Sequence, residues 1–167
     1  MASRRDDILN VAERLIRTHG YSGFSFREVA SAVGIKSASV HYHFPAKPDL
    51  AAAVARRYRE RFAQAVQDAE RSGTARIVAW RALFLKALQR DGLMCLCGIL
   101  AVEGDSLPRD VAREAHAFLR FGIDQIDEVS PGDGARVLSQ LQGAMLLARS
   151  AQDVGLFERA TENLAAA

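Results

Sequence analysis

The run Lys36–His43 brings hydrogen-bond donors and aromatic rings together at close spacing. It carries a cation, two serine hydroxyls, a phenol and two imidazoles, at Lys36, Ser37, Ser39, His41, Tyr42 and His43. Short donors, aromatic side chains and a cation suit hydrogen bonding to phosphate oxygens and to the edges of bases. We therefore expect this run to bind a nucleic acid; a helical hairpin with an ordinary solvated face is the alternative.

The surrounding stretch Phe26–Phe44 predicts two short helices, about 26–33 and 38–43, that position these side chains. Two helices joined by a tight turn need a small residue where they cross and a residue that turns the chain, and Ala30 and Gly34 meet these needs. The inward-facing residues are apolar: Val29, Val33, Ile35 and Val40. This spacing is typical of a helix-turn-helix.

Two serines mark where the short helices begin. Ser25 stands three residues before Glu28, which predicts a capping box at the start of the first helix. Ser37 is expected to cap the second helix by the same chemistry.

The formal charge is distributed unevenly between the two parts of the chain. Residues 1–62 hold eleven Lys/Arg and six Asp/Glu, net +5, whereas residues 63–167 hold eleven and fourteen, net −3. A basic N-terminal part and an acidic C-terminal part favour contact between the N-terminal part and a polyanion.

Nearly the whole sequence has the periodicity of helices, so the fold class is predicted to be all-α. Alternating strand patterns and hairpin turns are missing from the sequence. Besides the two short helices, the pattern predicts helices at about 4–19, 47–71, 74–90, 93–104, 108–129, 133–153 and 156–165.

Several classes of protein are disfavoured by the same sequence. No apolar run approaches the roughly 20 residues of a membrane span, so we expect no membrane association and a cytoplasmic location. Motifs of nucleophile elbows, phosphate loops, dinucleotide folds and zinc proteases are missing, so we expect neither an enzyme nor a cofactor. We also expect no metal site, because Cys95 and Cys97 have no further Cys or His donor nearby in sequence.

The segment from Arg5 to Leu50 resembles the DNA-binding domain of the TetR family of bacterial repressors. The resemblance lies in ILNVAERLIRTHGY, FSFREVASAVGI and VHYHFPAKPDL, including the Gly20-Tyr21 pair and the following Leu50. It implies a helix-turn-helix three-helix bundle over residues 1–47 and a helical ligand-binding and dimerisation domain over residues 48–167. It further implies a homodimer on a palindromic operator in double-stranded DNA, released by a small-molecule inducer. Repression is the commoner outcome in the family, and activation is the alternative.

Carried over by position, the resemblance assigns DNA-contacting roles. Tyr42 and Lys47 are expected to contact phosphates, and Arg27 to reach the flanking backbone. Val40 and Phe44 are expected to be core residues. The expected DNA-binding set is Arg27, Lys36, Ser37, Ser39, His41, Tyr42, His43 and Lys47.

The helix predicted at 133–153 is apolar nearly all round, and such a helix must be buried on several sides. An ordinary core helix of one chain is one interpretation, and a dimer interface with close approach at Gly143 and Ala144 is the other. The family plan favours the interface. The expected interface residues are Leu138, Leu141, Ala144, Met145, Ala148, Leu156, Phe157 and Leu164.

An inducer pocket is expected among the helices at 74–90, 93–104 and 108–129. Its candidate walls are Trp80, Phe84, Leu88, Cys95, Ile99, Phe118, Phe121 and Met145, although each such side chain is more often a core residue than a ligand contact. For Cys95 and Cys97, packing as small buried hydrophobes is favoured, and one electrophile-sensing thiol is the alternative. A reversibly bound apolar or aromatic inducer is favoured over such a thiol sensor.

Overall fold

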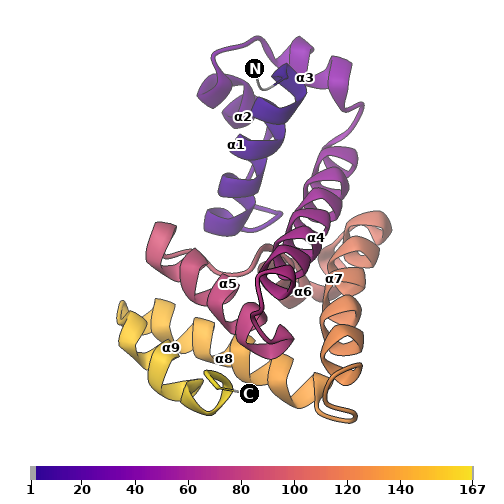
Figure 1. The fold of residues 1–167 in the computed structure, drawn as a ribbon. Helices are drawn as coiled ribbons and strands as arrows, with labels where there is room; N and C mark the ends of the chain where they lie inside the picture. Colours follow the sequence, from indigo (N-terminus) through magenta and orange to yellow (C-terminus); the bar gives the residue numbers. More distant parts are fainter. Residues whose placement is uncertain (1–2, 167) are drawn as a thin grey trace. The chain divides into compact units, whose positions relative to one another are not determined.

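A computed structural model describes residues 3–166, which contain helices and no strand. The prediction of an all-α fold is confirmed for these residues. The α-helices are α1 (Arg4–His19), α2 (Phe26–Val33), α3 (Ser37–His43), α4 (Lys47–Arg71), α5 (Arg76–Asp91), α6 (Leu96–Val102), α7 (Arg109–Asp127), α8 (Gly134–Ala151) and α9 (Val154–Ala160), with short 3-10 turns at Gly104–Ser106 and Glu162–Leu164 (Figure 1). Within this described range, none of the helices is both long and apolar enough to cross a membrane.

The helices form two compact units, and α4 and α7 each contribute to both. The first unit comprises Met1–Tyr58 and Leu96–Ala117, and the second comprises Arg59–Cys95 and Phe118–Ala167. The chain is predicted to divide between residues 47 and 48 into a DNA-binding part and a ligand-binding part. This division by function stays a prediction.

The first unit is built around α1. This helix packs against α2 and α6, and α2 packs against α3. Apolar residues at helical spacing are buried on α1 and on the elements that face it: Ile8, Leu9, Ala12, Ile16, Val29, Val40, Phe44, Leu50 and Val54. Burial of this stripe holds the three N-terminal helices and the start of α4 together.

The second unit is built around α5 and α8. Helix α5 packs against α8 and α9, and α8 packs against α9, as the pink α5, orange α8 and yellow α9 ribbons of Figure 1 show. The buried side chains of α5 lie four residues apart at Trp80, Phe84 and Leu88, which places them on one face of the helix.

Two predicted helix starts differ from the structure. Ser37 is the first residue of α3 rather than its cap; Lys36 occupies the cap position, and no side chain caps the helix. Helix α6 begins at Leu96 rather than near residue 93, because Leu93–Cys95 are not helical.

Candidate nucleic-acid interface

Helices α2 and α3 are joined by the tight turn that the sequence predicts. Gly34 adopts the left-handed conformation (φ 76°, ψ 37°), which a residue without a Cβ takes without strain. The Ile35 N–H then donates to the Ala30 carbonyl at 2.9 Å and closes the end of α2. Val29, Ala30 and Val40 are buried beneath the turn, so the predicted helix-turn-helix geometry is present.

Ser25 caps α2 as predicted, but the Glu28 side chain does not complete the predicted capping box. The Ser25 hydroxyl accepts from the Glu28 N–H at 3.3 Å and donates to the Glu28 carboxylate at 2.7 Å. The carboxylate thus binds the hydroxyl instead of the backbone N–H of Ser25. An acidic side chain in this first turn also interacts favourably with the helix dipole.

The outer face of α3 is open to solvent. Tyr42 is 85% exposed, which is unusual for an aromatic side chain and leaves its hydroxyl and ring available to a partner. Arg27, Lys36 and His41 are also exposed, whereas Ser37, Ser39, His43 and Lys47 are partly covered. All eight residues of the predicted DNA-binding set lie in the first unit. A DNA contact by any of them stays a prediction.

Ala38 belongs to this exposed face and was missed by the sequence analysis. It is exposed and lies one helical turn before His41 and Tyr42. Ala38 carries no polar group, but a small apolar side chain can contact the methyl group of thymine. Its exposure within α3, next to the buried Val40, is the signal that identifies it.

The ring of His41 is held by two neighbours. Its centroid lies 4.7 Å from that of Phe26 in an edge-to-face arrangement, and Nδ1 lies 3.3 Å from the Pro45 carbonyl oxygen. A carbonyl oxygen can only accept, so this hydrogen bond requires a proton on Nδ1. In neutral His41 the other nitrogen, Nε2, is then an acceptor suited to an amino group of adenine or cytosine.

Lys47 is fixed by two aromatic rings that the sequence analysis did not connect with it. Its ammonium nitrogen lies 4.5 Å from the ring centroid of Tyr21 and 4.7 Å from that of Phe24. The two rings themselves pack edge to face. Such cation–π contacts restrict a flexible side chain while leaving its charge in place.

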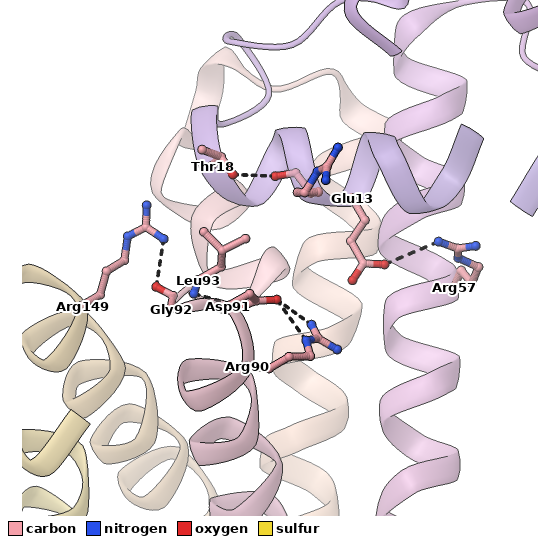
Figure 2. A network of polar contacts seen from close by, with 9 residues as sticks. Glu13, Thr18, Arg57, Arg90, Asp91, Gly92, Leu93 and Arg149 are labelled. Atoms are coloured by element: carbon pink, nitrogen blue, oxygen red, sulfur yellow. Dashed lines mark hydrogen bonds and ion pairs between the residues drawn. The ribbon is translucent and has the colours of Figure 1, made fainter. Parts of the chain in front are cut away.

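Polar contacts to α4 brace helix α1. Arg57 donates to Asn10 at 2.9 Å and lies 3.5 Å from the Glu13 carboxylate, and the Glu13–Arg57 pair is drawn in Figure 2. The start of α1 has a full capping box between Ser3 and Asp6, which the sequence analysis overlooked. Hydrogen bonds from Ser3, aided by the charges of Arg57 and Arg5, lower the pKa of Asp6.

Comparison with known proteins places this arrangement in a family. Residues 8–54 match the family model of the bacterial regulatory proteins of the tetR family. A TetR transcriptional regulator from Legionella pneumophila has the same fold with a TM-score of 0.89 and 30% sequence identity, covering 98% of this chain and 96% of that one. The chain belongs to the TetR family. The predicted resemblance is thereby confirmed, and the chain is a TetR-family transcriptional regulator of a DNA-binding, non-enzymatic class.

Two further relatives agree with the TetR assignment. A TetR-family transcriptional regulator from Agrobacterium tumefaciens is 28% identical with a TM-score of 0.85, covering 96% of this chain and 95% of that one. The HTH-type transcriptional repressor AcnR of Corynebacterium diphtheriae is 34% identical over 68 residues, which are 41% of this chain. That match spans only 36% of the length of AcnR.

The predicted pocket residues of the second unit include a closely packed aromatic cluster. Trp80 has its ring centroid 4.5 Å from that of Phe62 and 5.9 Å from those of Phe118 and Phe121, with Phe84 at 6.1 Å. Phe62 was missing from the predicted walls. The indole N–H of Trp80 is buried and has no hydrogen-bond partner among the described residues.

The other predicted wall residues are distributed differently. Leu88, Cys95 and Met145 are buried in the second unit, whereas Ile99 belongs to the first. Cys95 precedes α6, whereas Cys97 is the second residue of that helix, so the two cysteines do not lie on one helix. Both cysteines are fully buried.

A cavity of about 440 Å³ lies at the C-terminal end of α5 in the second unit. Of the predicted wall residues it includes only Leu88. Its lining comes from the end of α5, the end of α8 and the start of α9: Leu88, Gly92, Leu93, Ala148, Arg149, Gln152 and Val154. Figure 2 shows Arg149 directed toward the Gly92 carbonyl, 3.4 Å away.

The side chains of the predicted interface residues are mostly buried within the chain itself. Only Leu156 is partly exposed, and the other seven are buried: Leu138, Leu141, Ala144, Met145, Ala148, Phe157 and Leu164. The opposite face of α8 carries the exposed apolar residues, with Leu146 59% and Leu147 57% exposed beside the exposed Gly143. The core-helix interpretation therefore describes the buried face, and the opposite face of α8 is not covered within the chain.

Among residues 3–166 there is no group of three or more His, Cys, Asp or Glu side chains that could hold a metal ion.

Proposed function

We propose that the chain is a ligand-responsive repressor that binds a palindromic operator as a homodimer through the outer face of α3. The observation that carries this proposal is the exposed Tyr42 on the second helix of a helix-turn-helix, in a chain of the TetR family. Second helices of this motif lie in the major groove of DNA. Tyr42, Lys47 and Arg27 contact phosphates, and Lys36, Ser37, Ser39, His41 and His43 lie on or beside the bases.

The homodimer follows from the exposed face of α8. Leu146 and Leu147 are large apolar side chains that remain more than half exposed, and Gly143 lets a second helix approach closely. Their burial against a second copy of α8 removes this apolar surface from water. Two copies related by a two-fold axis then present two α3 helices to half-sites about one DNA turn apart.

The small-molecule inducer binds in the second unit. The indole N–H of Trp80 and the side-chain amide of Gln142 are buried in this unit, and neither has a hydrogen-bond partner among the described residues. Unpartnered buried groups are rare in proteins and are satisfied when a ligand or water binds. Because the surrounding walls are aromatic, we propose an apolar or aromatic inducer that carries a hydrogen-bond acceptor for Trp80.

Sensing of electrophiles is disfavoured by the burial of both thiols. A thiol reacts as the exposed thiolate, and Cys95 and Cys97 are fully covered. The two cysteines are therefore proposed as packing residues.

Selection from a pool of random duplexes tests the DNA-binding part of the proposal. The protein is expected to enrich an imperfect palindrome with a specific Kd on the order of 10⁻⁸ to 10⁻¹⁰ M. Enrichment of no sequence, or of a single unpaired half-site only, would contradict the dimeric repressor.

The fluorescence of Trp80 tests the inducer. It is the one tryptophan of the sequence, so its emission reports on the proposed inducer site at its own indole. A set of small aromatic compounds is titrated into the protein bound to its selected duplex. An inducer is expected to change Trp80 emission and release the duplex at the same concentration. Release without any change in emission would place the inducer elsewhere.

A further inference from the structure

The carboxylate of Glu103 binds the turn between α1 and α2. Its two oxygens accept from the Tyr21 N–H at 2.5 Å, from the Ser22 N–H at 3.2 Å and from the Ser22 hydroxyl at 3.0 Å. Glu103 directly follows α6, and all these residues belong to the first unit. Hydrogen bonds to an ionised carboxylate are stronger than those between neutral groups, so this side chain is a firm anchor for the turn.

Gly20 shows how closely the turn is fitted to Glu103. Its backbone has φ +76°, and a Cβ at this position would lie 2.5 Å from Oε1 of Glu103. A residue with a side chain would therefore be strained in its backbone and would also push the carboxylate away. The turn thus adopts a backbone conformation that suits both glycine and the bound carboxylate.

The anchored turn carries the ring that holds Lys47. The backbone N–H bound by Glu103 belongs to Tyr21, whose ring lies 4.5 Å from the Lys47 ammonium. Phe24, at the end of the same turn, provides the second ring at 4.7 Å. A displacement of this turn would move both rings and release the lysine.

We propose that Glu103 is a positioning residue for DNA binding: by holding the α1–α2 turn, it fixes Lys47 for contact with a phosphate. The inference rests on the proposed function, because it requires Lys47 to contact DNA. Glu103 itself touches no DNA and acts through Tyr21 and Ser22.

Simple electrostatics predicts the opposite effect of removing Glu103. A negative charge on the DNA-binding unit repels phosphates, so its neutralisation alone would tighten binding. The positioning role predicts weaker binding in Glu103→Gln, because an amide offers one acceptor oxygen where the carboxylate offers two. The sign of the change therefore separates the two explanations.

The experiment measures the Kd of the protein for the duplex that the wild type enriches from a random pool, over a series of salt concentrations. The variants are Glu103→Gln and Ser22→Ala, and Asp105→Asn is the matched control that removes an equal charge from an exposed residue two positions away. We expect Glu103→Gln to weaken binding about fivefold or more and Ser22→Ala to weaken it less. Asp105→Asn is expected to leave Kd unchanged or to lower it. Thermal unfolding checks that each variant is folded. If Glu103→Gln does not fold, the Kd of Ser22→Ala tests the inference instead.

The salt dependence distinguishes positioning from general destabilisation. Loss of one phosphate contact is expected to reduce the slope of log Kd against log salt by about 0.9. In a Lys47→Ala background, Glu103→Gln is expected to have no further effect on Kd, because the two residues act in series. Unchanged or tighter binding in Glu103→Gln, an unchanged slope, or full additivity with Lys47→Ala would overturn the inference. Failure of the wild type to enrich any duplex would instead overturn the proposed function.

Discussion

The ammonium nitrogen of Lys47 lies 4.5 Å from the centroid of the Tyr21 ring, although the two residues come from different elements of the first unit. Lys47 is the first residue of α4, and Tyr21 lies in the turn after α1. The contact keeps the lysine charge at the start of a long helix, where backbone N–H groups also favour a bound anion. The ring, the charge and the helix start therefore meet at the proposed phosphate contact of Lys47.

Replacement of Tyr21 by leucine is expected to weaken DNA binding about two- to fivefold, because a cation–π contact of this kind contributes about 0.5–1 kcal/mol. Tyr21→Phe is the matched control, since it keeps the aromatic face and removes only the hydroxyl. Fluorescence anisotropy on the selected duplex measures both. Equal losses in the two variants would show that the ring does not hold Lys47 for DNA.

The dimer proposal is tested on the exposed face of α8. Leu147→Asp is expected to give monomers in sedimentation at micromolar concentration, because the new carboxylate would be buried without a partner in the interface. Val102→Asp introduces the same charge at a side chain that is 85% exposed in the first unit and is expected to leave the dimer intact. A dimeric Leu147→Asp protein, or a monomeric wild type, would refute this interface.

Gly122 makes room for the indole of Trp80 within α7. A Cβ at Gly122 would lie 2.9 Å from Cη2 of Trp80 and 3.2 Å from Cδ2 of Leu138. Alanine is favoured over glycine in helices by about 1 kcal/mol, yet Gly122→Ala is expected to destabilise the protein by about 1–3 kcal/mol through overpacking.

Chemical denaturation of a double-mutant cycle checks this cause. In a Trp80→Phe background the indole atoms nearest Gly122 are removed while the contact with Leu138 remains, so Gly122→Ala is expected to cost less than in the wild type. An equal cost in both backgrounds would mean that the indole is not what excludes a side chain at Gly122.

The capping box of α1 predicts a dependence of stability on pH. The pKa of Asp6 is lowered from 3.8 by hydrogen bonds from Ser3, so its contribution is present above pH 3.8 and is lost as the pH falls through the lowered folded-state pKa. Wild type and Asp6→Asn are therefore expected to differ in unfolding free energy at neutral pH and to converge in acid. A difference that stays constant from neutral to acid pH would rule out the carboxylate as its source.

The helix-turn-helix was predictable from sequence because its determinants are local. Gly34 needs a left-handed conformation, Ser25 stands at a cap position, and Val29 and Val40 follow the spacing of a buried helix face. Each of these signals lies within a few residues of its structural consequence. The predicted ranges of the helices therefore agree with the structure to within a few residues.

Contacts between distant residues could not be predicted in this way. Glu103 and Ser22 are separated by 81 positions, and no periodicity connects them. Which face of α8 is buried within its own chain was likewise not predictable, because both faces carry leucine. Burial decides this, with Leu141 at 0% and Leu147 at 57% exposure.

The affinity of the Tyr42→Ala variant for the selected duplex tests the central claim most directly. Val102→Ala is the control, because Val102 and Tyr42 are both 85% exposed but only Tyr42 lies on α3. The wild type and Val102→Ala are expected to bind the selected duplex tightly and to lose affinity steeply as the salt concentration rises. Tyr42→Ala is expected to bind about tenfold more weakly than the wild type, by the same factor for the selected duplex and for random duplexes. Wild-type affinity in Tyr42→Ala, or wild-type binding that does not respond to salt, would contradict DNA recognition by the outer face of α3.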